Sequence, residues 1–86
     1  MHDHVSTQEV AWILDHSPGT IRDRIKAGEI DAMRIVGGFR IPKAEALRLA
    51  RERIEAEDGR KVSDRELERL IDELIATNEA NQPASP

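Results

Sequence analysis

The chain has 86 residues, of which 38% are hydrophobic and only 2% aromatic, with no cysteine and a formal net charge of −4 at pH 7. A chain of this length forms one small domain with a thin core, which excludes a large cleft enzyme and favours a binding module. The lack of cysteine excludes disulfides and thiolate chemistry, and no apolar run approaches the roughly 20 residues of a membrane span, so we expect a cytoplasmic chain without a signal peptide.

A first helix is predicted from Thr7 to about Asp15 by the signals at its start. Ser6 stands three residues before Glu9, which is the spacing of a capping box, and two valines occupy the positions of a hydrophobic staple around it. Aliphatic residues at i, i+3 and i+4 form the expected core stripe of this helix. They are Val10, Ile13 and Leu14. Trp12 points away from that stripe, so its ring needs a cover from elsewhere.

A second helix of about ten residues is predicted after a short break. Ser17 supplies a capping hydroxyl directly before Pro18, which is favoured in the first helical turn, and Gly28 is the expected stop. The apolar pair of this helix is Ile21 and Ile25, so a short polar and basic face lies on the opposite side. The residues of that outer face are Gly19, Thr20, Arg22, Asp23 and Lys26.

A β-hairpin is predicted over residues 31–42, where the helical period is lost around a pair of glycines. Two registers are compatible with the sequence. A two-residue Gly-Gly turn pairs Ile35 with Arg40, whereas a three-residue loop pairs Ile35 with Phe39 and sets Arg34 opposite Arg40. We prefer the second register, because it puts the apolar side chains on one face and both arginines on the other. Like charges in that position are stabilised by an anion, so this register predicts a phosphate contact.

Two longer helices are predicted in the second half of the chain. Pro42 opens the third helix, which ends near Gly59. The helix runs through Ala44, and its expected apolar stripe consists of Leu47, Ala50 and Ile54. The fourth helix runs over residues 64–77, and Ser63 with Glu66 repeats the capping box of the first. Its stripe, the clearest amphipathic pattern in the chain, consists of Leu67, Leu70, Ile71, Leu74 and Ile75.

Two apolar surfaces have no partner within the first three helices, namely Trp12 and the stripe of the fourth helix. We therefore expect the fourth helix either to fold back against the first helix or to contact another protomer. The residues expected in this packing are Trp12, Leu67, Leu70, Ile71 and Leu74. Residues 78–86 are polar and contain two prolines, so we expect them to form a disordered tail.

Charge is unevenly distributed along the chain. Residues 1–16 carry three acidic residues and no lysine or arginine, residues 17–53 carry nine basic against five acidic residues, and residues 54–86 carry four basic against nine acidic residues. The net charge of −4 therefore conceals a basic middle segment between acidic ends. That segment contains the second helix and the hairpin, and a basic patch of this kind favours a polyanionic partner.

The order of a short helix, a tight break, a second helix with a basic outer face and a hairpin describes a winged helix-turn-helix. Residues 5–50 resemble the excisionase branch of the MerR-like winged-helix proteins. The positions that carry the resemblance are Thr7, Glu9-Val10-Ala11, Ile13-Leu14, Ser17, Thr20-Ile21, Gly28-Glu29-Ile30, Gly37 and Phe39-Arg40-Ile41-Pro42. The chain departs from this family at Arg24, where an aliphatic residue is common, and at Gly38, where an arginine often stands at the tip of the hairpin.

The resemblance implies a mainly α fold with a small β-hairpin wing, that is, a winged helix-turn-helix plus a C-terminal amphipathic helix. Residues 1–58 would form the DNA-binding domain, residues 59–77 the C-terminal helix and residues 78–86 the tail. In such a fold the second helix lies in the major groove and the wing lies against the adjacent minor groove or backbone. The residues that this implies at the DNA are Ser17, Gly19, Thr20, Arg22, Asp23, Arg24, Lys26, Arg34, Arg40 and Lys43.

Within this set, the resemblance gives the residues different parts. Arg22 and Lys26 would reach base edges or phosphate, while the Ser17 end of the helix would meet phosphate. The wing arginines and Lys43 would clamp the backbone. Arg24 borders the buried stripe and would either reach phosphate or pair with an acid. Asp23 would either accept from a cytosine amino group or pair with a neighbouring base of its own helix.

The function that follows from the resemblance is that of an excisionase-like recombination directionality factor. Such a protein binds double-stranded DNA cooperatively at an attachment site, bends it and assists a site-specific integrase. Self-association on DNA and a bacterial or phage-encoded, nucleoid-associated origin are part of the same expectation. The alternatives are a small MerR-like transcriptional regulator and, in another class, a phage or element adaptor such as a terminase small subunit.

Catalysis, cofactors and metals are not expected. His2, His4 and His16 have a pattern that can bind zinc or nickel, but the first two lie near the chain start and His16 is expected to pack between helices. A carboxylate pair such as Asp64 and Glu68 is better explained as part of a solvated helix face than as a general acid and base. The expected protein is therefore not an enzyme.

Overall fold

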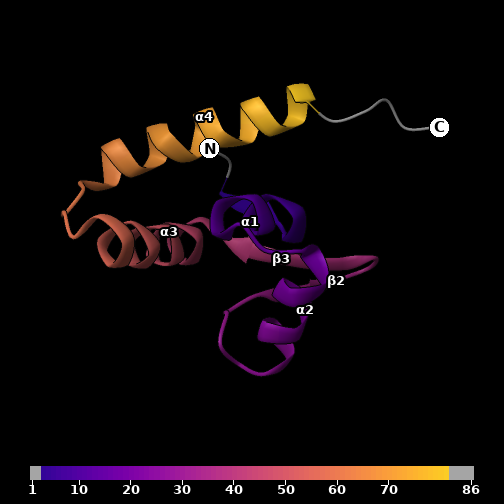
Figure 1. Ribbon diagram of the computed structural model, residues 1–86. Helices are drawn as coiled ribbons and strands as arrows, with labels where there is room; N and C mark the ends of the chain where they lie inside the picture. The colour runs from indigo at the N-terminus through magenta and orange to yellow at the C-terminus, as the bar shows by residue number, and fades with distance from the viewer. Residues whose placement is uncertain (1–2, 82–86) are drawn as a thin grey trace.

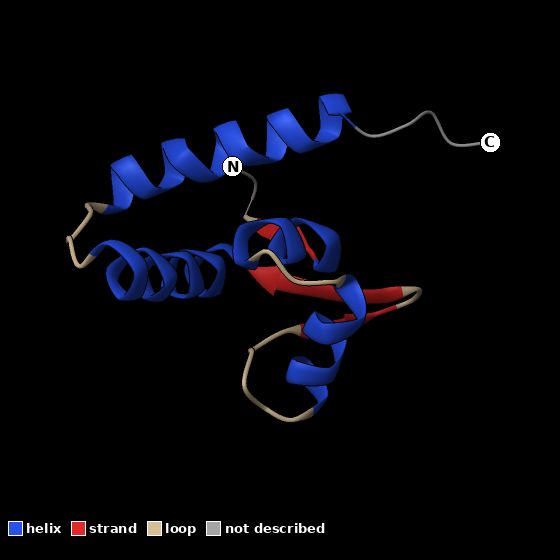
Figure 2. Cartoon of the chain, in the orientation of Figure 1, coloured by secondary structure: helices blue, strands red, loops and turns tan. Residues whose placement is uncertain are grey.

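The computed structural model describes residues 3–81 as helices packed around a small antiparallel sheet (Figures 1 and 2). Its elements in chain order are β1 (His4–Ser6), α1 (Thr7–Leu14), α2 (Pro18–Lys26), β2 (Met33–Ile35), β3 (Gly38–Pro42), α3 (Lys43–Asp58) and α4 (Asp64–Asn81). The predicted fold class, a mainly α winged helix-turn-helix with a C-terminal helix, is confirmed. None of the helices in the described part combines the length and apolar composition needed to cross a membrane.

The helix starts lie where the local signals predict them. The Ser6 side chain accepts from the backbone N–H of Glu9 at 3.0 Å, and the Glu9 carboxylate accepts from the Ser6 N–H at 2.9 Å, which completes the capping box of α1. Pro18 occupies the first turn of α2, and Gly59, with φ of +67°, closes α3. Backbone donors at these helix ends are therefore satisfied by residues a few positions away in the sequence.

The sheet contains a strand that was not predicted. β1 pairs antiparallel with β3, so that Val5 lies opposite Ile41, and the strand order is β1-β3-β2. Val5 is 3% exposed and Ile41 is fully buried. Val5 was expected only to pack against the start of α1 as part of the hydrophobic staple. It is instead a buried residue of β1, because β3 offers that segment a hydrogen-bonding edge.

The hairpin has neither of the two registers considered from the sequence. Ile35 pairs with Gly38 and Arg34 pairs with Phe39, which leaves Val36 and Gly37 as the two turn residues. Gly37 has a φ of +89°, the left-handed conformation that a tight turn of this kind requires at its second residue. The prediction that Arg34 lies opposite Arg40 is therefore wrong, because the turn contains two residues and the preferred register assumed a three-residue loop over Val36 to Gly38.

The core joins every layer of the molecule. The five largest side chains with less than 2% exposure come from α1, α2, the loop before β2, β3 and α4. They are Val10, Ile21, Ile30, Ile41 and Leu67. On α3, the predicted stripe is confirmed in part: Ala50 is buried and Leu47 and Ile54 are half-buried against the core. The buried face also includes Ala46 and Leu49, which were not predicted. The reason is that α3 packs on α1, α4 and the sheet together, so its buried arc is set by several neighbours.

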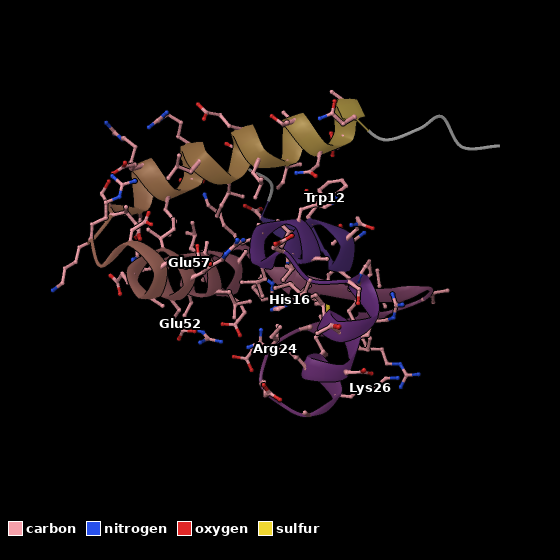
Figure 3. All side chains as sticks on the ribbon, viewed as in Figure 1. Trp12, His16, Arg24, Lys26, Glu52 and Glu57 are labelled. Atoms are coloured by element: carbon pink, nitrogen blue, oxygen red, sulfur yellow. The ribbon has the colours of Figure 1, made fainter. Side chains whose placement is uncertain are left out.

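Helix α4 folds back over α1 and α3, which is the first of the two arrangements expected for it (Figure 1). Leu67 and Ile71 are buried, whereas Leu70 and Leu74 are half-buried. Trp12 is half-buried and projects from α1 toward α4 (Figure 3). The helix continues to Asn81, so residues 78–81 of the expected tail are helical, and residues 82–86 lie outside the described part.

Glu45, in the first turn of α3, ties the loop before the wing to that helix. One of its carboxylate oxygens accepts the backbone N–H of Asp31 at 2.8 Å, and Arg48 donates to both oxygens at 2.6 and 2.7 Å. These hydrogen bonds satisfy a residue that is only 7% exposed. The hydrogen bond from Arg48 is the main cause that lowers the pKa of Glu45, although burial acts in the opposite direction. The anchor therefore depends on the ionised carboxylate.

Replacing this carboxylate tests the anchor. Glu45→Gln is expected to lower the free energy of unfolding at neutral pH by about 1 to 3 kcal/mol. The amide has one oxygen instead of two, so its NH₂ group would face an N–H donor of Asp31 or Arg48 and could not accept a hydrogen bond from it. The folded-state pKa lies below the unfolded-state value near 4.5, so the wild-type advantage is complete above that value and is lost as the pH falls through the folded-state pKa. Urea unfolding between pH 7 and pH 3 measures the difference, and an advantage that grows on acidification contradicts this assignment.

Candidate nucleic-acid interface

The turn between α1 and α2 sets the direction in which α2 leaves the body of the protein. Asp15 closes α1 in the left-handed conformation, with a φ of 56°. Ser17 caps α2: its hydroxyl accepts the backbone N–H of Thr20 at 3.2 Å and lies 3.0 Å from the Thr20 hydroxyl. His16 is exposed, so the expectation that it packs between helices is wrong. The backbone around it makes the turn, since the His16 N–H donates to the carbonyl of Ala11.

Helix α2 presents the polar outer face that its spacing predicts. Ile21 is fully buried, whereas Arg22, Asp23 and Lys26 are exposed on the side away from the core. A Cβ atom added to Gly19 would come no closer than 3.9 Å to any neighbour, so the fold itself does not require glycine there. A glycine without a structural reason in a helix is consistent with close approach of an external partner to the backbone.

Two adjoining hollows lie between α2 and the β2–β3 hairpin, here called the wing. One, of about 280 Å³, is lined by three basic side chains from two elements, Arg22 and Lys26 of α2 and Arg34 of β2. The other, of about 310 Å³, also includes Arg22 and extends toward the start of α1. The wing side of both hollows is formed by Ile35, Gly37, Gly38 and Phe39. Together they form a basic surface, which we call the α2–wing groove.

Apart from Arg24, the basic side chains of α2 and the wing lack an acidic partner among the described residues, unlike most others in the chain. Seven of the arginines and lysines make ion pairs, and within residues 3–81 six do not. The six without an ion pair are Arg22, Lys26, Arg34, Arg40, Lys61 and Arg65. Four of them belong to α2 and the wing. Uncompensated positive charge is thus concentrated there, although the chain is acidic overall.

Two residues expected at the DNA are engaged elsewhere in the protein. Arg24 pairs with Glu29 at 3.4 Å and is partly buried. Lys43 forms an ion pair with Glu68 of α4, and this hydrogen-bonded contact is the main cause that raises the pKa of Lys43. Asp23, by contrast, is exposed and makes no ion pair with the bases of its own helix. Arg24 and Lys43 therefore make contacts within the protein in this structure.

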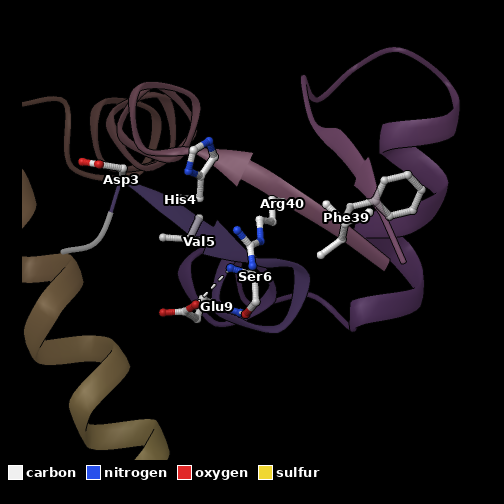
Figure 4. Close-up of a pocket in the computed structure, with 8 residues that line it drawn as sticks. Asp3, His4, Val5, Ser6, Glu9, Phe39 and Arg40 are labelled. Atoms are coloured by element: carbon white, nitrogen blue, oxygen red, sulfur yellow. Dashed lines mark hydrogen bonds between the residues drawn. The ribbon is translucent and has the colours of Figure 1, made fainter. Parts of the chain in front are cut away.

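Arg40 lies on the opposite face of the sheet from the α2–wing groove. It pairs with Ser6 of β1 and with Met33 of β2, and it lines a third hollow of about 490 Å³ next to β1, which shares Ile35 and Phe39 with the α2–wing groove (Figure 4). Acidic residues, Asp3 and Glu9, also line this hollow. The structure therefore brings Arg22, Lys26 and Arg34 together and places Arg40 apart from them, which the sequence did not predict.

The histidines form no metal site within the part of the chain that the structure describes. No group of three His, Cys, Asp or Glu side chains there is arranged to hold a metal ion. His4 is exposed on β1 and His16 is exposed in the turn after α1, while His2 lies outside the described residues. The basic surface is therefore the candidate site that the described residues support.

Comparison with known families agrees with this geometry. A family model described as a helix-turn-helix domain matches residues 5–54, which include most of β1, all of α1, α2 and the wing, and most of α3. The chain therefore belongs to the helix-turn-helix domain family, and this membership indicates DNA binding. Comparisons with curated proteins and with solved structures gave no significant match. Helix α4 lies beyond the matched region, so its packing onto α1 is a feature of this chain that the family match does not cover.

Proposed function

We propose that this protein binds double-stranded DNA in a sequence-specific manner, with α2 in the major groove and the wing at the neighbouring minor groove or backbone. The observation that carries the proposal is the α2–wing groove, where three basic side chains without acidic partners converge from two elements. A major groove about 12 Å wide admits an α-helix, and phosphates on either side of it attract the flanking cations. No catalytic step is part of the proposal.

The outer residues of α2 take different parts in this proposal. Arg22 and Lys26 are exposed and long enough to reach base edges or phosphates. The capped start of α2, at Ser17 and Thr20, offers backbone and hydroxyl donors to a phosphate. Gly19 lets the DNA backbone approach the helix closely, and Asp23 is available to accept from a cytosine amino group. Arg34 contacts phosphate from the wing.

The finer proposal is an excisionase-like recombination directionality factor. It binds repeated sites beside a recombination core, bends the DNA and assists a site-specific integrase. Its support is the resemblance of residues 5–50 and the separation of charge, because the acidic C-terminal segment is suited to meet the basic segment of a neighbouring protomer or an integrase. Bending a short site costs on the order of 1–6 kcal/mol, which several protomers bound side by side can share.

Footprinting on the DNA around its own gene tests this function, after the preferred sequence has been selected from random duplexes. Several protected repeats spaced by whole helical turns next to a recombination core are the expected result. A single inverted repeat over a promoter overturns the excision proposal in favour of a small transcriptional regulator. Failure to select or protect any sequence overturns DNA recognition itself and leaves an adaptor, such as a terminase small subunit, as the better reading.

A further inference from the structure

The wing carries one arginine on each of its two faces. Because side chains alternate along a strand, residues paired across the hairpin share a face. Arg34 pairs with Phe39 and so lies on the face turned to α2, whereas Arg40 pairs with Met33 and lies on the outer face. Both arginines are exposed, and neither makes an ion pair with another described residue. Two free cations therefore stand back to back on one hairpin.

The tip between these arginines is narrow and apolar. Its turn consists of Val36, whose side chain is as exposed as a side chain can be at 103%, and Gly37. Cβ atoms added at Gly37 and Gly38 would meet nothing within 4 Å, so the tip is free of neighbours on both sides. In Figure 1 the hairpin extends beyond the helices. A single isopropyl group is thus the only side chain at the leading end of a projecting hairpin.

A narrow tip flanked by cations on both faces matches the two-walled shape of a DNA minor groove. That groove is about 6 Å wide, and each of its walls is a sugar–phosphate strand. We propose that the wing straddles the minor groove, with Val36 and Gly37 entering it, Arg34 on the strand nearer to α2 and Arg40 on the opposite strand. The inference rests on the proposed DNA binding and adds the strand that each arginine contacts and a contact for Val36.

Straddling also predicts which base pairs the wing accepts. A G·C pair presents the guanine N2 amino group in the minor groove, while an A·T pair presents only acceptors. The apolar side chain of Val36 cannot accept a hydrogen bond from that amino group and would displace the water that does. A·T-rich tracts also have a narrow minor groove with enhanced negative potential, which favours arginines at its walls. The wing therefore selects A·T pairs without reading them in the major groove.

Strand-specific removal of phosphate charge tests the positions of the two arginines. The duplex is the sequence selected by the wild-type protein, with neutral methylphosphonates placed in one strand or the other beneath the wing. Wild-type binding is expected to weaken with either modified strand. Arg34→Ala should become insensitive to one modified strand only, and Arg40→Ala to the other, each with a salt dependence smaller by about 0.9 in log–log slope. Arg65→Ala, which removes an equally free arginine from α4, is the matched control and should resemble wild type.

Three outcomes overturn the straddling wing while leaving DNA binding by α2 intact. They are insensitivity of both wing variants to the same strand, an Arg40→Ala variant that stays sensitive to both strands, and wing variants that bind as wild type while Arg22→Ala loses affinity. If neither the wild-type protein nor any variant binds the duplex, the proposed DNA-binding function itself is refuted. All substituted side chains are exposed, so thermal unfolding of each variant should match wild type.

Inosine substitution tests the contact of the tip. An inosine·cytosine pair has the major-groove atoms of G·C but lacks the N2 amino group, so its minor groove resembles that of A·T. Wild-type protein is expected to bind A·T and inosine·cytosine duplexes within about twofold of each other and G·C duplexes several-fold more weakly. Val36→Ser, which can accept from the amino group, should reduce this preference. Equal weakening by inosine·cytosine and G·C places the discrimination in the major groove and refutes the proposed contact.

Discussion

Replacing Arg22, Lys26 and Arg34 together by glutamine is expected to remove most of the salt dependence of DNA binding. Each phosphate neutralised contributes roughly 0.9 to the slope of log K against log salt, so four free cations, these three and Arg40, give a slope near −3.5. With only Arg40 left, the slope falls to about −0.9. Between 50 and 200 mM salt the wild-type affinity should fall roughly 130-fold and the variant affinity only about 3- to 4-fold, as fluorescence anisotropy titrations would measure.

The control for this triple variant must change the net charge equally without touching the α2–wing groove. Glutamine at Lys61, Arg65 and Arg69 does so, because the first two make no ion pair and the third makes only an exposed one with Glu73. Exposed pairs of this kind contribute little to stability, so the control should fold normally. We expect its salt slope to equal that of wild type. Equal loss of slope in both variants would mean that net charge, and not local contact, governs binding.

Features that depend on neighbours in the sequence were predictable. The capping box of Ser6 and Glu9, the cap at Ser17 before Pro18 and the stop at Gly59 all rest on groups within four residues of each other. The buried face of α2 followed from its apolar spacing, so its exposed face did as well. The helix-turn-helix and the basic surface of α2 could therefore be predicted from sequence.

Features that depend on distant partners were not predictable. The pairing of Val5 with Ile41 joins residues 36 positions apart, and no local pattern marks His4–Ser6 as a strand. The hairpin register was missed because the glycine pair allows turns of different lengths and positions, and only the structure shows a two-residue turn of Val36 and Gly37. That one-residue difference separates Arg34 from Arg40 and changes what the wing can contact.

The difference between free and paired cations was predicted only for Arg24, whose pairing with an acid was one of two alternatives. Counting charges by segment treats Arg24 and Arg22 alike, although Glu29 neutralises only the first. Helical spacing would have identified some pairs, such as Arg48 with Glu52 and Arg53 with Glu57, because they stand at i and i+4. The contact of Lys43 with Glu68 crosses from α3 to α4 and has no such signal. Identifying the cations without an ion pair therefore requires the structure, and four of the six such cations among the described residues lie in α2 and the wing.

Leu67→Ala is expected to lower the free energy of unfolding by about 2 to 5 kcal/mol, the range found when a large buried aliphatic side chain is truncated. Leu67 is fully buried among core residues of α1 and α3, although it belongs to the helix beyond the family match. A chain of this size has a total stability of about 4 to 13 kcal/mol, so the change is a large part of it. Leu70→Ala, at a half-buried position of the same helix, is the matched control and should have a smaller effect.

Two spectroscopic probes separate the unfolding of α4 from that of the whole chain. Trp12 fluorescence reports on the contact with α4, because the side chain projects toward that helix (Figure 3). Far-UV circular dichroism reports on all the helices together. If α4 shares one core with the winged helix-turn-helix, Trp12 fluorescence and far-UV circular dichroism should unfold together in urea, both at a lower midpoint in Leu67→Ala. Helix α4 and α2 lie on opposite sides of α1 (Figure 1), so the variant should keep wild-type DNA affinity at temperatures where it is folded. An early Trp12 transition with unchanged circular dichroism would instead make α4 an independently melting segment, whose apolar stripe is released for another partner without unfolding the DNA-binding surface.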